Sequence, residues 1–131
     1  MDSPKILVIE DDPSIWDLLG QQLRIAGFTT VFAFDGISAM KMARQERPDL
    51  IVLDIGLPAG DGFVVMERLR AMPATCGIPV IVLSARGHEP NPSRAIELGA
   101  AAFVPKPYKR EELIKLINVA LHRLPVPDAV A

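Results

Sequence analysis

The stretch DLIVLDIGLPAGDG at residues 49–62 decides how the chain folds. Its apolar residues 50–53 lead without interruption to Asp54, and a loop rich in glycine and proline follows. A short, continuously apolar run is typical of a strand that is buried on both faces at the centre of a parallel sheet. Ligands bind at the carboxyl ends of such strands. A strand-terminal aspartate also commonly begins a turn, so the rest of the chain has to decide whether Asp54 is functional.

Strand-like and helix-like segments alternate along the whole sequence. β-prone or apolar runs predict strands at residues 5–9, 29–34, 50–54, 78–84 and 101–104. Apolar residues at helical spacing predict helices from Pro13 to a stop at Gly27, from about Ile37 to before Pro48, from about Phe63 to before Pro73, over residues 93–98, and from about Leu113 to near Arg123. Strand and helix in alternation predict an α/β fold, a doubly wound parallel sheet with helices on both faces.

Size and composition predict one globular domain. The chain has 131 residues, of which 50% are hydrophobic and 23% charged, and its formal net charge is −2. A balance this close to neutral offers no basic surface for nucleic acid or for an anionic membrane. The single cysteine, Cys76, makes neither an internal disulfide nor a metal site. With no leader-like or membrane-spanning stretch in the sequence, we expect a cytoplasmic protein.

Polar side chains follow four of the five predicted strands. Glu10 and Asp11 follow the first, Asp54 ends the third, Ser84 ends the fourth and Lys106 follows the fifth. Because the carboxyl ends of parallel strands meet at one edge of the sheet, we expect these groups to converge. Each of them taken alone is more often an ordinary surface or turn residue, but their common placement favours a functional site.

The acids in this group predict a metal site. Two carboxylates about 4 Å apart repel by roughly 4 kcal/mol at an effective dielectric constant of 20, so clustered acids take up protons or bind a cation. A ligand set made only of oxygens favours Mg²⁺, which accepts a phosphate oxygen alongside protein carboxylates. In phosphate chemistry Asp54 would attack phosphorus, Lys106 would offset negative charge and Ser84 would donate its hydroxyl to the product.

The order and placement of these residues resemble the receiver domain of two-component response regulators: Glu10, Asp11, Asp54, Ser84, Lys106 and Pro107. The resemblance extends from about Lys5 to Leu124, so residues 1–124 are expected to form the receiver domain and residues 125–131 a tail or the start of a linker. It implies a flavodoxin-like sheet with strand order 2-1-3-4-5. It also implies Mg²⁺-dependent transfer of a phosphoryl group from a histidine kinase to Asp54.

The resemblance further assigns individual roles. Glu10, Asp11 and the backbone carbonyl of Gly56 would bind Mg²⁺ together with Asp54, and Ser84 and Lys106 would contact the phosphoryl group. Ser84 and Phe103 would form the switch, and the bond between Lys106 and Pro107 would be cis.

The implied partners are a sensor histidine kinase or a histidine phosphotransfer protein, and a downstream protein or an output domain not present in this chain. The protein would act as a signalling switch rather than as an enzyme. It would contact neither nucleic acid nor membrane directly, and it would be a monomer or a weak dimer.

Several positions depart from the family pattern. Gly56 has no side chain where many relatives carry one, and Arg86 places a cation near the site; both positions influence phosphoryl lifetime in the family. The loop with Pro90 and Pro92 is unusually stiff for a segment that moves on activation. Ala101-Ala102 replaces the acidic pair that is common in relatives with a winged-helix output domain.

Three other functions compete with this interpretation, and the sequence argues against the first two. A flavodoxin-type cofactor protein shares the fold, but the acidic residues 10–12 would repel a phosphate. A haloacid-type phosphatase would carry an Asp-x-Asp nucleophile motif after the first strand, which this chain lacks. A receiver-shaped interaction module regulated without phosphorylation is the main alternative.

Four other residues are given no chemical role. Trp16 and Cys76 are assigned to packing, and His88 and His122 are expected to be exposed.

Overall fold

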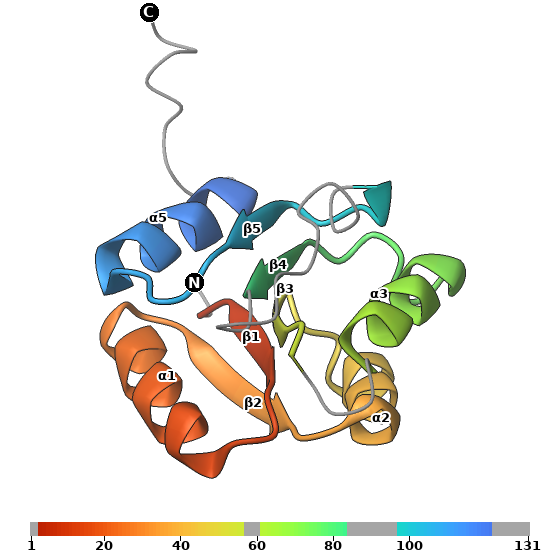
Figure 1. Ribbon diagram of the computed structural model, residues 1–131, viewed down its shortest axis with the longest axis horizontal. Helices are drawn as coiled ribbons and strands as arrows, with labels where there is room; N and C mark the ends of the chain where they lie inside the picture. The colour runs from red at the N-terminus through yellow and green to blue at the C-terminus, as the bar shows by residue number, and fades with distance from the viewer. Residues whose placement is uncertain (1–2, 57–60, 84–96, 122–131) are drawn as a thin grey trace, which may run out of the picture.

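A computed structural model describes residues 3–56, 61–83 and 97–121 (Figure 1). These residues form a parallel sheet of five strands in the order β2-β1-β3-β4-β5, as predicted. The strands are β1 (Lys5–Ile9), β2 (Thr29–Ala33), β3 (Leu50–Asp54), β4 (Val80–Leu83) and β5 (Ala102–Val104). The helices are α1 (Pro13–Ile25), α2 (Gly36–Glu46), α3 (Asp61–Ala71) and α5 (Arg110–Ala120). None of the helices in these ranges is long and apolar enough to cross a membrane.

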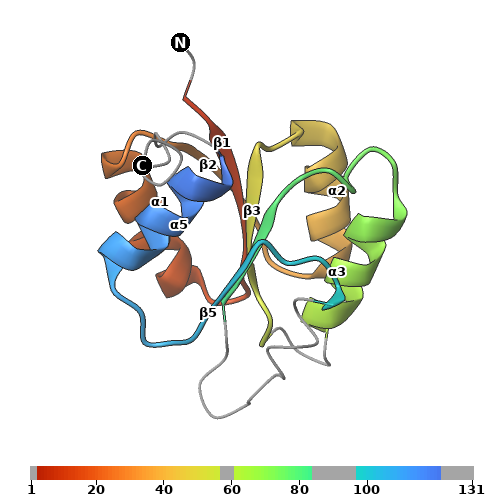
Figure 2. The ribbon, with the colours of Figure 1, turned by 90° about the horizontal axis from the view of Figure 1, so that it is seen from above.

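The sheet separates two hydrophobic layers. Figure 2 shows α1 and α5 on one face of the sheet and α2 and α3 on the other. Along β3, Leu50 and Val52 pack with residues of α1 and α5, whereas Ile51 and Leu53 pack with residues of α2 and α3. Every residue of this strand is buried, so the prediction that the run before Asp54 forms the centre of the sheet is confirmed. Asp54 lies beside Leu83 of β4.

Most helix ends follow the sequence signals. Asp12 caps α1, because its carboxylate accepts a hydrogen bond from the Ser14 N–H, and Pro13 begins the helix. Gly27 follows the end of α1 with a φ of +98°, a conformation that favours glycine. Asp35 is the N-cap of α2, in a capping box with Ser38.

Three of the predicted strands are longer than the observed ones. Phe34 does not continue β2, because its N–H donates to the Ser38 hydroxyl. β4 begins at Val80 rather than at residue 78: Pro79 has no N–H, and the carbonyl of Ile78 accepts a hydrogen bond from Arg70 instead. β5 begins at Ala102, one residue later than predicted.

Three of the described helices begin slightly earlier than predicted. α2 starts at Gly36, α3 at Asp61 and α5 at Arg110, because capping and first-turn residues carry no apolar periodicity. Residues 84–96 and 122–131 lie outside the described part of the chain. Most of the predicted helix at 93–98 and the predicted end of α5 near residue 123 therefore fall outside it. Gly99, which directly follows this predicted helix, has a φ of +93°.

Candidate functional site

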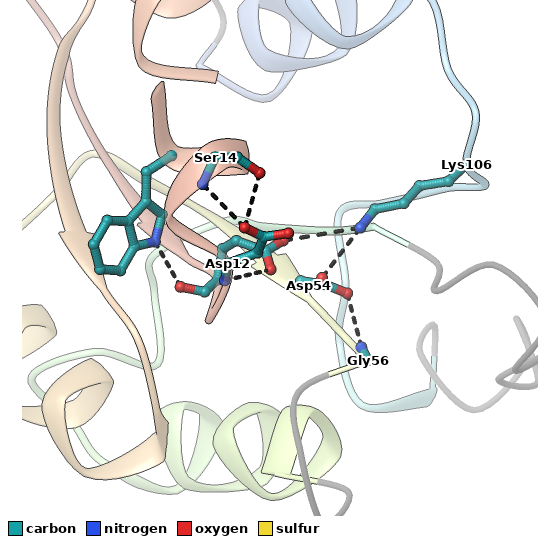
Figure 3. A network of polar contacts seen from close by, with 7 residues as sticks. Asp12, Ser14, Asp54, Gly56 and Lys106 are labelled. Carbon is teal, nitrogen blue, oxygen red and sulfur yellow. Dashed lines mark hydrogen bonds and ion pairs between the residues drawn. The ribbon is translucent and has the colours of Figure 1, made fainter. Parts of the chain in front are cut away.

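The carboxyl ends of β1, β3 and β5 bring the predicted polar residues together, as Figure 3 shows for Asp54 and Lys106. Glu10 directly follows β1, Asp54 is the last residue of β3, and Lys106 follows β5 by two residues. Glu10, Asp11 and Asp54 each offer a carboxylate oxygen that lies within 4.8 Å of the other two. The predicted convergence of these acids with Lys106 is therefore observed, while Ser84 lies outside the described residues.

Asp54 is buried, with 5% of its surface exposed, and both of its carboxylate oxygens are engaged. Oδ1 accepts a hydrogen bond of 2.8 Å from the Gly56 N–H, and Oδ2 lies 3.1 Å from Lys106 Nζ (Figure 3). Burial by itself would raise the pKa of Asp54. Hydrogen bonds from Glu10 and the Gly56 N–H, together with the charge of Lys106, outweigh burial and lower this pKa below its ordinary value. Asp54 is therefore an ionised carboxylate at neutral pH.

Glu10 is the second buried acid, with 3% of its surface exposed. The pKa of Glu10 is raised to about 8, first by burial and then by a hydrogen bond to Asp54 and the charge of Asp54, against smaller lowering effects of the Asp12 N–H and Lys106. Its Oε2 accepts a hydrogen bond of 3.1 Å from the Asp12 N–H. A buried carboxyl beside an ionised one keeps its proton unless a cation takes the proton's place.

These donors fit a hard divalent cation. Glu10 Oε1 is buried and accepts no hydrogen bond from a described residue; Lys106 Nζ lies 3.8 Å away. Asp11 is exposed, and no ion pair ties it to another described residue, so its carboxylate is available to a ligand. An all-oxygen set of three carboxylates with one unsatisfied buried oxygen suits Mg²⁺, which the sequence predicted.

Lys106 provides the positive charge of the site. Its Nζ lies 3.1 Å from Asp54 Oδ2 and 3.8 Å from Glu10 Oε1, and its side chain is 24% exposed. The peptide bond between Lys106 and Pro107 is cis, at the position where the resemblance implied one. One ammonium group thus faces both buried acids, on a side chain that is partly exposed to solvent.

The predicted switch residue Phe103 lies on β5 beside Val82 of β4. It is half-buried and packs against the core layer of α2 and α3. It also lines a surface groove of about 420 Å³ together with residues of β5, α5 and the segment between them: Val104, Pro105, Pro107, Glu112, Lys115 and Leu116. Its partner in the predicted switch, Ser84, lies outside the described residues, as do Arg86, His88, Pro90, Pro92 and His122.

Two residues near the site were not predicted to act there. Trp16 was assigned to packing, and its ring does pack against Phe32 and Phe34, but its indole Nε1 also donates a hydrogen bond to the backbone carbonyl of Glu10. Gly62, in the first turn of α3, lies so close to the main chain of Ile55 that a Cβ atom at this position would come within 2.6 Å of the Ile55 carbonyl oxygen. For Trp16, the only signal in the sequence is its position about one helical turn after the acidic cluster. For Gly62, the only signal is a glycine close to a helical pattern.

Comparison with known proteins identifies relatives over nearly the whole chain. Residues 6–118 match the family model described as "Response regulator receiver domain". The chain is 41% identical over 120 residues to the DNA-binding dual master transcriptional regulator RpaA of Synechocystis, covering 92% of this chain and 50% of that protein. It is 40% identical over 121 residues to the transcriptional regulatory protein PrrA of Mycobacterium tuberculosis, covering 92% of this chain and 51% of PrrA. The chain thus spans about half the length of these curated relatives.

Solved structures agree with this result. A putative response regulator from Chloroflexus aurantiacus superimposes with a TM-score of 0.85 at 29% identity, covering 93% of this chain and 100% of that one. The chemotaxis response regulator CheY4 of Vibrio cholerae superimposes with a TM-score of 0.80 at 25% identity, covering 90% of this chain and 98% of that one.

Proposed function

Because the chain belongs to the response regulator receiver domain family, we propose that Asp54 accepts a phosphoryl group from a histidine kinase or a histidine phosphotransfer protein. The main support is the state of Asp54: a buried carboxylate that stays ionised and whose Oδ2 lies 3.1 Å from the Lys106 ammonium. A carboxylate must be deprotonated to attack phosphorus. A neighbouring cation is needed where the incoming phosphoryl group adds negative charge.

In the proposed reaction a carboxylate oxygen of Asp54 forms a bond to phosphorus while the bond between phosphorus and the donor histidine nitrogen breaks. Glu10, Asp11, Asp54 and the Gly56 carbonyl would hold Mg²⁺, which supplies positive charge for the phosphoryl oxygens when it is bound. Lys106 moves from its contact with Asp54 Oδ2 to the new phosphoryl oxygens. The Gly56 N–H stays on the Asp54 carboxyl group and orients it.

Output would follow from this local change in charge. Ser84 and Lys106 donate to the phosphoryl oxygens, Phe103 moves further into the core, and the surface around β5 and α5 changes shape for a downstream partner. The groove of about 420 Å³ beside Phe103 supports this assignment. Residues 1–124 act as a receiver and signalling switch whose output lies in a partner or in a domain outside this chain, with residues 125–131 as a tail or linker. The cytoplasm remains the expected location.

The functional test is phosphorylation by acetyl phosphate. Wild-type protein incubated with acetyl phosphate and Mg²⁺ should gain the mass of one phosphoryl group, which reduction with borohydride maps to Asp54. Asp54→Asn should gain none, whereas Asp17→Asn, which changes an exposed acid on α1, should behave like wild type. Equal labelling of Asp54→Asn and wild type would refute the assignment. Absence of labelling in wild type under conditions that label a known receiver would favour the alternative, an interaction module regulated without phosphorylation.

We also propose that activation leaves the protein a monomer or a weak dimer. Ala101 is exposed and Ala102 half-buried, and neither offers a charge to a salt bridge across β5. Light scattering with and without beryllofluoride and Mg²⁺ measures the mass of each state. A tight activated dimer whose formation is abolished by high salt would contradict this prediction.

A further inference from the structure

The indole of Trp16 is hydrogen-bonded to the main chain of the metal-binding turn. Trp16 lies in the first turn of α1, and its Nε1 is 2.5 Å from the backbone carbonyl oxygen of Glu10. The indole ring packs against Phe32 and Phe34 in tilted arrangements, with their ring centroids 5.8 and 6.5 Å away. Trp16 is the single tryptophan of the chain, so no other indole can replace this contact.

This bond completes a closed set of contacts around Glu10. The Glu10 N–H donates to the carbonyl of Ala33 on β2 at 2.9 Å, and Glu10 Oε2 accepts from the Asp12 N–H at 3.1 Å. The backbone carbonyl of Asp12 in turn accepts a hydrogen bond of 3.2 Å from the backbone N–H of Trp16. The backbone on both sides of Glu10 is thereby fixed to β2 and to α1. Asp11, the middle residue of this turn, is exposed.

We propose that Trp16 is a positioning residue of the metal site, which fixes the turn of residues 10–12 so that Glu10 and Asp11 meet the cation together. The role rests on the Mg²⁺ site of the proposed function. Some groups do not bind a metal themselves but form hydrogen bonds to its ligands and orient them. Removing such a group typically weakens metal affinity or activity by about 10–100-fold. A side chain without an N–H at position 16 would leave the Glu10 carbonyl without its partner, and the turn would have to be ordered when the cation binds.

The test compares two variants that disturb the same aromatic group. Trp16→Phe keeps a ring but removes the hydrogen bond to Glu10. Phe34→Leu removes a ring that contacts Trp16 and keeps the hydrogen bond; Phe34 is 54% exposed, so the change should leave the fold intact. We expect calorimetry to give a Mg²⁺ dissociation constant about 10-fold larger than that of wild type for Trp16→Phe. For Phe34→Leu the constant should stay within about 2-fold of wild type. The melting temperatures without Mg²⁺ should be similar for the two variants.

Equal dissociation constants for Trp16→Phe and wild type, or equal weakening in both variants, would overturn the positioning role. Wild-type protein that binds no Mg²⁺ would overturn the metal site itself and this role with it, a result distinct from a variant that binds like wild type.

A second measurement needs no variant. The single indole N–H gives one resonance in a ¹H–¹⁵N spectrum of the full chain. The hydrogen of this indole should exchange with solvent more slowly than it does in unfolded protein. The resonance should also shift as Mg²⁺ is added, and the dissociation constant fitted to this shift should equal the one from calorimetry. An indole N–H that exchanges as it does in unfolded protein, or that does not respond to Mg²⁺, would show that Trp16 does not position the turn.

Discussion

Lys106 Nζ lies 3.1 Å from Asp54 Oδ2 although the two residues are 52 positions apart in the chain. The sheet makes this contact possible, because β5 pairs with β4 and β4 with β3, so the ends of all three strands lie at one edge. The same ammonium group is 3.8 Å from Glu10 Oε1. One lysine therefore faces two buried acids: it offsets the charge of the ionised Asp54 and lies close to Glu10.

Lys106→Ala should slow phosphorylation of Asp54 by acetyl phosphate. The ammonium stabilises charge that grows as the phosphoryl group transfers, and removal of one such preorganised group costs about 100-fold or more in rate. The rate of mass gain under saturating Mg²⁺ measures the effect. Lys115→Ala, which removes an exposed lysine from α5, serves as the control and should react at the wild-type rate. Equal rates for the two variants would show that Lys106 does not act on the phosphoryl group.

Mg²⁺ should raise the thermal stability of the protein. A ligand that binds only the folded state adds about 2.7 kcal/mol to the free energy of unfolding when its concentration is 100 times the dissociation constant. Asp11→Asn should lose most of this response. Because Asp11 is exposed, the same variant should melt like wild type when Mg²⁺ is absent.

Thermal melts over a range of Mg²⁺ concentrations separate these two effects, and Asp17→Asn is the matched control because it also neutralises an exposed acid. The assignment of Asp11 as a ligand fails if Asp11→Asn and Asp17→Asn respond equally to Mg²⁺. Calcium in place of Mg²⁺ tests whether the response depends on the size of the cation.

The sheet and the acidic site could be predicted because both depend on simple patterns. Residues 50–53 are apolar without interruption because β3 is buried on both faces, and a parallel sheet brings its strand ends together whatever the loops do. Glu10, Asp54 and Lys106 could therefore be placed at one edge of the sheet before any distance was known.

Some backbone conformations, and some contacts between a side chain and a particular backbone atom, could not be predicted. The helix-ending residue Arg47 adopts a φ of +48°, and nothing in its side chain indicates this. The hydrogen bond from Trp16 to the Glu10 carbonyl depends on where α1 begins. It also depends on how the indole packs against Phe32 in β2 and Phe34 just after it. Neither the helix register nor a ring orientation follows from apolar spacing, which indicates only the face that is buried.

The capping box of α2 should make stability depend on pH through Asp35. Hydrogen bonds from the Ser38 N–H and hydroxyl lower the pKa of Asp35 below its ordinary value of 3.8. Because the folded-state pKa is the lower one, the ionised group contributes stability that is fully present above pH 3.8 and is lost as the pH falls through the folded-state pKa. Asp35→Asn keeps a capping oxygen but cannot titrate.

Chemical unfolding of wild type and Asp35→Asn from pH 7 downward measures this difference. Wild type should have the larger free energy of unfolding at pH 7. Its difference from Asp35→Asn should become smaller as the pH falls and Asp35 takes up a proton. Asp35→Ala should be less stable than Asp35→Asn at every pH, because it also loses the cap. A gap between wild type and Asp35→Asn that does not change with pH would contradict the role of the charge.

Gly62→Ala should be strongly destabilising, in contrast to Gly77→Ala. A Cβ on Gly62 would lie 2.6 Å from the carbonyl oxygen and 2.7 Å from the Cα of Ile55, whereas a Cβ on Gly77 meets nothing within 4 Å. Main-chain atoms cannot swing aside as a flexible side chain does, so α3 or the segment of Ile55 and Gly56 must move. Overpacking of this kind costs about 1–3 kcal/mol and occasionally more.

The displaced segment includes Gly56, whose N–H holds Asp54 Oδ1, so Gly62→Ala should also weaken the response to Mg²⁺ and slow phosphorylation. Gly77→Ala should change the free energy of unfolding by less than about 1 kcal/mol and leave both activities unchanged. Urea unfolding and acetyl phosphate labelling of the two variants test the pair. If Gly62→Ala proves as stable and as reactive as Gly77→Ala, the close approach of α3 to Ile55 does not hold the end of β3 in place. If Gly62→Ala is destabilised but reacts normally, the contact supports the fold without positioning Asp54.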